Sequence, residues 1–138
     1  MMRVFADAFF YLALLNPRDR AHGAACDWAK RRDLAFVTTE FVLLEVADAL
    51  SAPSTRKTAS ALLRKLRSDE DTHVVVVSPD ILEEALLLFE QRPDKAWSLT
   101  DCTSFVVMQQ QRLEDALTGD QHFEQAGLRA LMRAGIGQ

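Results

Sequence analysis

The sequence predicts an α/β protein with one central parallel sheet of four to five strands and helices on both faces of that sheet. Strand-like and helix-like segments alternate along the chain, and several of the strand-like segments are continuous apolar runs. Such runs are typical of parallel strands that are buried on both faces. The 138 residues are enough for one hydrophobic core and too few for two. We therefore expect a single domain over residues 1–138.

Proline delimits the elements that we expect in the first half of the chain. Asn16-Pro17 ends the first helix, and Pro53 ends the helix that directly follows the second strand, because proline lacks the amide hydrogen that a helix interior needs. The expected elements are a strand at Arg3–Ala6, helices at 7–15 and 22–32, a strand at 35–38, and helices at 39–51 and 54–68.

The second half opens on the clearest strand, His73–Val77, in which β-branched valines dominate. Ser78-Pro79 then supplies a helix N-cap followed by proline at the first helical position. The remaining expected elements are helices at 80–91 and 99–113, a strand at 115–118, a short helix from about 120 to 125, and an edge strand at 128–132.

The composition is that of an ordinary globular protein, with 49% hydrophobic and 26% charged residues. The longest apolar runs, Val74–Val77 and Leu86–Phe89, are far shorter than a membrane span. No signal peptide is expected at the N-terminus, where an aspartate stands at position 7. The two cysteines, Cys26 and Cys102, are expected to be reduced. These features together predict a cytoplasmic protein.

The net charge of −4 argues against nucleic-acid binding through bulk electrostatics. The charge is uneven, however, because residues 54–67 include five basic side chains and no acid. A solvated helix face is the ordinary interpretation of such a run. The alternative is contact with an RNA backbone, for which the candidates are Arg56, Lys57, Arg64 and Lys65.

Four acids, Asp7, Glu45, Asp101 and Asp120, are far apart in the sequence but have related positions in the predicted fold. Asp7 and Asp120 each follow a predicted strand, and ligands of parallel sheets bind beyond the carboxyl ends of the strands. Glu45 and Asp101 reach that edge if their helices are oriented toward it. A cluster of carboxylates is suited to a hard cation such as Mg²⁺. The pattern therefore predicts a metal-dependent phosphodiesterase, with a small ribonuclease as the favoured kind.

Each acid also has a structural explanation. Asp7 and Asp120 suit the N-terminus of a helix, and Ser98 with Asp101 fits a capping box. Glu45 differs, because it lies inside an almost wholly apolar helix and is expected on a buried side of it. A buried carboxylate needs a partner, and a metal is the favoured one.

Hydroxyl groups near these acids are candidates for orienting metal ligands, and those that we single out are Ser98, Ser104 and Thr118. His122, two residues after Asp120, is expected to be exposed, although its position brings it near the acids. His22 and His73 show no spacing that is typical of a zinc site. The sequence contains no glycine-rich phosphate loop and no serine or cysteine nucleophile paired with a histidine.

Four segments resemble the motifs of the PIN-domain family, and in particular those of its VapC-type toxins. They are Val4-Phe5-Ala6-Asp7, residues 38–45, residues 98–105 and residues 116–123. The resemblance implies a three-layer α/β/α domain that cleaves RNA with Mg²⁺ or Mn²⁺. It also implies that all four acids are catalytic, that Asp7, Asp101 and Asp120 bind the metal, and that Glu45 binds it directly or through water. Ala8 departs from the family, many of whose members have a hydroxyl or amide side chain at this position.

The resemblance further implies an RNA substrate, a small antitoxin protein as partner, and a homodimer. Two alternatives stay open within the family, namely an RNA-processing nuclease without a toxin role and a non-catalytic module that binds RNA or protein. A receiver-like signalling domain is a third alternative. It would need two adjacent acids after the first strand, where this chain has Asp7 alone.

Overall fold

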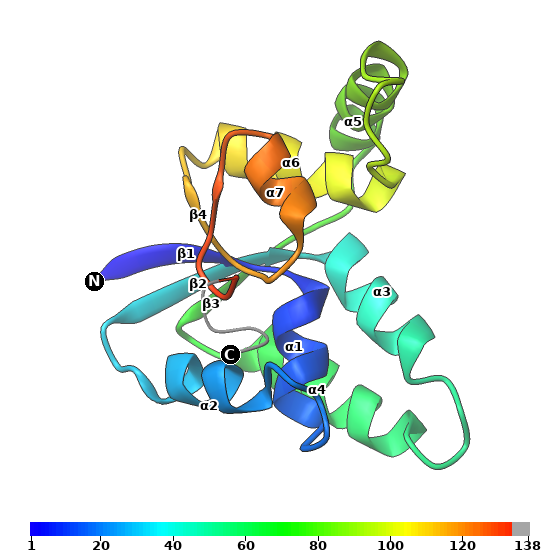
Figure 1. Ribbon diagram of the computed structural model, residues 1–138. Coiled ribbons are helices and arrows are strands. Elements are labelled where there is room, and N and C mark those ends of the chain that lie inside the picture. Colours follow the sequence, from blue (N-terminus) through cyan, green and yellow to red (C-terminus); the bar gives the residue numbers. More distant parts are fainter. Residues whose placement is uncertain (134–138) are drawn as a thin grey trace.

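In the computed structural model, which describes residues 1–133, helices cover both faces of a parallel sheet (Figure 1). The five strands of this part of the chain have the order β3-β2-β1-β4-β5, and every neighbouring pair is parallel. The predicted fold class is therefore confirmed. The strands are β1 (Met2–Ala6), β2 (Leu34–Thr39), β3 (Thr72–Val75), β4 (Asp115–Leu117) and β5 (Arg129–Ala130).

The helices form the outer layers (Figure 1). They are α1 (Ala8–Leu15), α2 (His22–Lys30), α3 (Glu40–Ala49), α4 (Arg56–Ser68), α5 (Pro79–Gln91), α6 (Leu99–Gln110) and α7 (Gln121–Gln125). Helices α1, α2 and α4 lie on one side of the sheet, and α6 and α7 lie on the other. Helix α5 packs beside α6 and extends away from the body of the molecule. Within residues 1–133, no helix has the length and apolar character needed to cross a membrane.

The middle strands are buried because a helix layer covers each face of the sheet. Val4, Phe5 and Ala6 of β1 are fully buried, as are Ala116 and Leu117 of β4. On one side, Phe123 of α7 lies 6.3 Å from Phe5 and 5.0 Å from Phe105 of α6, measured between ring centroids. This aromatic cluster removes a large apolar area from water, and that burial fixes α6 and α7 against the sheet.

The strand order creates a switch point between β1 and β4. After β1 the sheet grows through β2 and β3 on one side, whereas β4 and β5 extend it on the other. Ligands of such sheets bind where the order reverses, beyond the carboxyl ends of the strands. Ala6 pairs with Leu117, so the next residues, Asp7 and Thr118, stand side by side at this edge.

Hydrogen bonds fix the ends of the central strands at the same edge. Thr38 donates its hydroxyl to the carbonyl oxygen of Ala6 at 2.8 Å, which ties the end of β2 to the end of β1. The Thr39 hydroxyl accepts from the amide of Val42 at 3.0 Å and caps α3. These two bonds join the ends of β1 and β2 and the start of α3 at this edge.

Several predicted boundaries differ from the structure. Val76 and Val77 were expected in β3 but lie outside it, and the Val77 amide donates instead to Glu40 Oε1 at 2.7 Å. The helix predicted over 99–113 ends at Gln110 because Arg112 adopts a left-handed conformation with φ of 57°. The amide of Leu113 then bonds the carbonyl oxygen of Met108 at 2.8 Å, a Schellman ending. The helix predicted over 22–32 ends at Lys30, and the strand predicted over 128–132 is only Arg129–Ala130.

Candidate active site

Asp7 presents a buried carboxylate at the switch point. It directly follows β1, occupies the N-cap position of α1 and is only 7% exposed. Within residues 1–133, the Asp7 side chain accepts no capping hydrogen bond from an amide of α1. Its Oδ2 instead accepts a hydrogen bond from the Thr118 hydroxyl at 2.8 Å. Burial raises its pKa to about 7; the Thr118 bond opposes this shift, and nearby Glu45 and Asp101 add to it.

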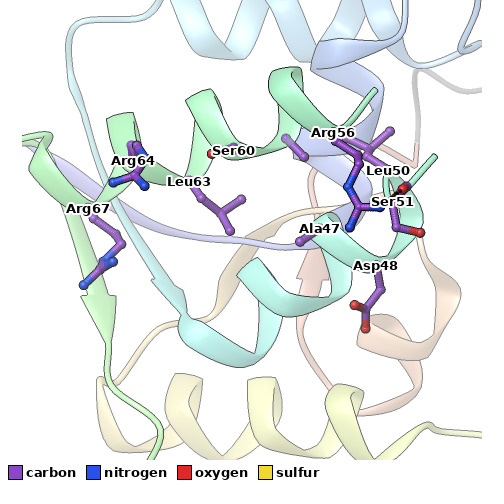
Figure 2. A pocket seen from close by; sticks show the side chains of 10 residues that line it. Ala47, Asp48, Leu50, Ser51, Arg56, Ser60, Leu63, Arg64 and Arg67 are labelled. Carbon is purple, nitrogen blue, oxygen red and sulfur yellow. Dashed lines mark hydrogen bonds between the residues drawn. The ribbon is translucent and has the colours of Figure 1, made fainter. Parts of the chain in front are cut away.

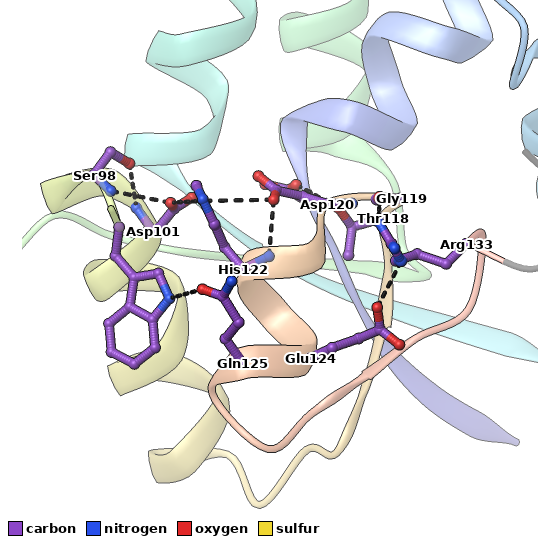
Figure 3. A network of polar contacts seen from close by, with 11 residues as sticks. Ser98, Asp101, Thr118, Gly119, Asp120, His122, Glu124, Gln125 and Arg133 are labelled. Carbon is purple, nitrogen blue, oxygen red and sulfur yellow. Dashed lines mark hydrogen bonds and ion pairs between the residues drawn. The ribbon is translucent and has the colours of Figure 1, made fainter. Parts of the chain in front are cut away.

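Asp101 is oriented by the predicted capping box at the start of α6, which the structure confirms. The Ser98 hydroxyl accepts from the Asp101 amide at 2.9 Å, and Asp101 Oδ2 accepts from the Ser98 amide at 3.0 Å. The same Oδ2 is also 2.9 Å from His122 Nδ1 (Figure 3). The Asp101 side chain therefore both caps α6 and belongs to the acid cluster.

Asp120 caps α7 and lies next to the histidine that follows it. Its Oδ1 accepts from the His122 amide at 2.9 Å and is 3.4 Å from His122 Nδ1. Ligand atoms of Asp101, Asp120 and His122 all lie within 4.8 Å of one another. The expectation that His122 is exposed is therefore wrong. Its side chain is 23% exposed and bridges the carboxylates of α6 and α7 (Figure 3).

Glu45 corrects a second expectation. We expected it on a buried side of its helix, yet Glu45 is exposed, and neighbouring Leu44 is 58% exposed. The reason is that α3 buries the side containing Val42, Leu43 and Val46 and leaves the rest of this apolar helix open. The Glu45 carboxylate still belongs to the cluster, because partial desolvation and then nearby Asp101 and Asp120 raise its pKa.

The four predicted acids lie in one region, but within residues 1–133 only Asp101 and Asp120, with His122, have ligand atoms within 4.8 Å of one another, and Asp7 and Glu45 are outside that group. Asp7 is within electrostatic reach of Glu45 and Asp101, and Glu45 is within reach of Asp101 and Asp120. Within residues 1–133, none of the four forms an ion pair with lysine or arginine. Mutual repulsion of this kind is relieved when a cation binds, and an oxygen-rich donor set with one almost fully buried carboxylate suits a hard divalent cation.

The three hydroxyl groups that we expect to orient metal ligands differ in their hydrogen bonds. Thr118 donates to Asp7 and accepts from the amide of Asp120 at 3.1 Å, so one hydroxyl links two of the acids. Ser98 orients Asp101 through the capping box. Ser104 is buried, and its hydroxyl has no hydrogen-bond partner among residues 1–133. The proposed orienting role therefore has a contact to support it at Thr118 and Ser98 but not at Ser104.

A model of the PIN domain matches residues 4–128 of the chain, nearly the whole of the described structure. The chain belongs to the PIN-domain family. This PIN domain is 30% identical over 125 residues to VapC20 of Mycobacterium tuberculosis, strains CDC 1551 / Oshkosh and ATCC 25618 / H37Rv, a 23S rRNA-specific endonuclease. The match covers 90% of this chain and 94% of VapC20.

Solved structures agree with this assignment. The crystal structure of VapC20, described as a Sarcin-Ricin loop cleaving toxin, superposes with a TM-score of 0.85 at 28% identity and covers 94% of this chain and 98% of VapC20. VapBC2 of Rickettsia felis, bound to a promoter DNA fragment, gives a TM-score of 0.63 at 12% identity, with 91% and 93% covered. A toxin–antitoxin complex from Klebsiella pneumoniae gives 0.57 at 19% identity, with 86% and 87% covered. The last two similarities concern the fold alone.

Proposed function

We propose that this PIN-domain protein is a divalent-metal-dependent endoribonuclease and the toxin of a toxin–antitoxin pair. The observation that carries the proposal is the group of ligand atoms of Asp101, Asp120 and His122 within 4.8 Å of one another. The Asp7 and Glu45 carboxylates are within electrostatic reach of this group, and none of the four acids has a lysine or arginine partner in residues 1–133. Homology over nearly the full length to an RNA endonuclease supports the same reaction class.

Asp7, Asp101 and Asp120 would bind Mg²⁺ or Mn²⁺, and Glu45 would bind it directly or through water. When bound, such a cation activates water for attack on a phosphodiester and stabilises charge on the leaving oxygen. The chain's other residues keep the ligands in place. Thr118 orients Asp7, the capping box with Ser98 orients Asp101, and His122 holds the Asp101 carboxylate close to Asp120.

The raised pKa of Asp7 makes cation binding at this carboxyl group depend on pH. With a pKa of about 7, the Asp7 carboxyl is partly protonated at neutral pH when no cation is bound. The Asp7 carboxyl would hold a cation only in its ionised form, so it would lose that proton when a cation binds. Affinity for the cation is therefore expected to rise with pH up to about 7 and to level off above it.

The proposed substrate is RNA, and the proposed partners are a small antitoxin protein and a second copy of the chain in a cytoplasmic homodimer. VapC20 acts on 23S rRNA, which makes ribosomal RNA the first substrate to test. An RNA-processing nuclease without a toxin role would share every active-site residue, so the distinction between the two rests on experiment.

The substitution Asp101→Asn tests the proposal. Asparagine can still accept the capping hydrogen bond, so the fold is expected to survive while one ligand charge is lost. We expect cleavage of purified ribosomal RNA in Mg²⁺ to fall at least about 100-fold, in line with the loss of several kcal/mol of transition-state stabilisation. Expression of the wild-type chain should arrest bacterial growth, and expression of the variant should not.

Glu83→Gln is the matched control, because Glu83 is an exposed acid on α5, outside the acid cluster. It should leave both cleavage and growth arrest unchanged. If the folded Asp101→Asn protein cleaves RNA as fast as wild type, the nuclease assignment fails. If wild type cleaves RNA but its expression leaves growth untouched, the toxin role fails and the RNA-processing alternative is favoured.

A further inference from the structure

A pocket of about 430 Å³ lies between α3 and α4, outside the acid cluster (Figure 2). Ala47 and Asp48 of α3, and Ser51 just after it, line one side. The other side consists of residues of α4, among them Arg56, Ser60, Arg64 and Arg67. Three arginines and one aspartate therefore line the same pocket, with Arg56 at one end of it and Arg64 and Arg67 at the other.

The arginines of this pocket have no acidic partner among residues 1–133, a property that they share with Arg3, Arg18, Arg20, Arg32 and Arg112. Within residues 1–133, Arg56, Arg64 and Arg67 form no ion pair, whereas Arg31, Arg92, Arg129 and Arg133 each pair with a carboxylate. Arg56 donates from one guanidinium nitrogen to the carbonyl oxygen of Ser51 at 2.9 Å, which leaves its other donors free. The pocket thus has an excess of positive charge that the described chain does not neutralise.

The spacing of these residues suits an extended polyanion. Arg56, Ser60, Arg64 and Arg67 recur at intervals of three or four residues, so they share one side of α4. From Arg56 to Arg67 the helix rises about 16 Å, more than one phosphate group needs. Guanidinium and hydroxyl donors are the usual partners of a nucleic-acid backbone, and the fork of arginine binds phosphate in a bidentate way.

Helix α3 connects this pocket to the acid cluster. Glu45 belongs to the cluster and Asp48 lines the pocket. Residues three apart are neighbours on a helix surface, about 5–6 Å apart between Cβ atoms. A strand with one phosphodiester at the carboxylates therefore needs to extend only about one helical turn along α3 to reach the α3 side of the pocket, and the arginines line the other side.

We propose that the α3–α4 pocket is a phosphate-binding subsite for the RNA strand that is cleaved at the acid cluster. The identity of the strand rests on the proposed function, but binding in the pocket does not require catalysis. Only some of the basic residues of α4 line this subsite. Arg56, Arg64 and Arg67 line it, whereas Lys57 does not and Lys65 lines a different pocket beside Phe10 and Tyr11.

The test measures binding of a 5′-fluorescein-labelled single-stranded RNA to the full chain by fluorescence anisotropy, with EDTA present so that cleavage plays no part. Arg64→Gln is compared with Lys57→Gln, which removes the same charge from the same helix outside the pocket. We expect at least a fivefold loss of affinity for Arg64→Gln, a larger loss for the double variant with Arg67→Gln, and less than a twofold loss for Lys57→Gln. The slope of log K against log salt should fall by about 0.7 for each phosphate contact removed.

Circular dichroism and thermal unfolding of each variant establish that it is folded. Equal losses for Arg64→Gln and Lys57→Gln would overturn the subsite, because general charge would then explain the binding. Unchanged RNA affinity in the double variant, together with lost binding of a glutamate-rich peptide, would assign the pocket to an acidic protein segment instead. If the RNA results hold while neither wild type nor Asp101→Asn cleaves RNA, the proposed function fails and the subsite stands.

Discussion

At the scale of the residue, Asp7 is both buried and ionisable, and burial disfavours the ionised form of its carboxyl group. The end of β1 places its carboxylate in a nearly closed environment, where burial raises its pKa to about 7. Thr118 supplies one neutral hydrogen-bond donor, and the nearest charged groups are other carboxylates. The folded protein without a cation therefore binds a proton at Asp7 more tightly than the unfolded chain does.

This raised pKa predicts a pH-dependent stability. Because the pKa of Asp7 rises from 3.8 to about 7 on folding, the free energy of unfolding falls as the pH increases between these values and is constant above them. Between pH 5 and pH 7.5 in EDTA, Asp7 alone contributes a loss of up to about 3 kcal/mol. Asp7→Asn should remove that contribution and make the variant more stable than wild type at pH 7.5.

Urea unfolding of both proteins at the two pH values, in EDTA, measures the effect. Glu83→Gln is again the control, because an exposed glutamate on α5 should leave the pH dependence of wild type unchanged. Excess Mg²⁺ should stabilise wild type at pH 7.5 and have little effect on Asp7→Asn. The same decline in stability with pH in Asp7→Asn and wild type would contradict the burial argument.

At the scale of the element, the start of α6 positions a ligand through its cap. Ser98 and Asp101 satisfy each other's amides, and this reciprocal bond limits the directions in which the Asp101 carboxylate can point. The acid cluster therefore depends on the exact place where α6 begins. Other helices of the protein have caps without such a consequence, which allows the two effects of a cap to be separated.

We predict that Ser98→Ala both destabilises the protein and weakens binding of a divalent cation. Loss of an N-cap hydroxyl costs about 1 kcal/mol, and a less restrained Asp101 should lower Mn²⁺ affinity several-fold in calorimetric titration. Ser78→Ala is the matched control, because the Ser78 hydroxyl caps α5 by accepting from the Ile81 amide at 3.2 Å. It should destabilise to a similar extent and leave Mn²⁺ affinity unchanged. Equal Mn²⁺ affinities in the two variants would contradict the positioning role of Ser98.

The elements also show which features the sequence could predict. The caps at Ser78 and Ser98 depend on residues within a few positions of each other, so local patterns were enough to find them. The contact of His122 with Asp101 joins α7 to α6 across 21 positions. The exposure of Glu45 depends on which side of α3 meets its neighbours. No local pattern contains that information, and for these two residues the expectations were wrong.

At the scale of the whole molecule, the sheet order decides the site. The sequence predicted parallel strands and carboxylates at their ends, but not that β1 and β4 are neighbours. That pairing places Asp7 beside Thr118 and makes the two halves of the chain share one edge. The fold also separates charge of the two signs, with acids at the switch point and three arginines around the pocket between α3 and α4. A net charge of −4 is therefore compatible with RNA binding, because the charge at the acid cluster and the charge at the α3–α4 pocket both differ from the net charge of the whole chain.

Helix α5 presents the surface on which the predicted homodimer can be tested. Leu82, Leu86 and Phe89 are 41%, 37% and 45% exposed, and their spacing of four and three residues places them on one side of the helix. Helix α5 extends away from the body of the molecule (Figure 1). Exposed apolar stripes of this kind are typical of surfaces that associate.

We predict that wild type is a dimer in light scattering coupled to size exclusion, and that Leu86→Glu is a monomer at the same micromolar concentration. A glutamate in the middle of the stripe would be buried without a partner in the dimer, which costs several kcal/mol, whereas on the monomer it is exposed and harmless. Asp80→Asn, at an exposed acid on a different side of the same helix, should stay dimeric. A Leu86→Glu protein that is still dimeric would place the interface elsewhere, and a monomeric wild type would contradict the homodimer itself.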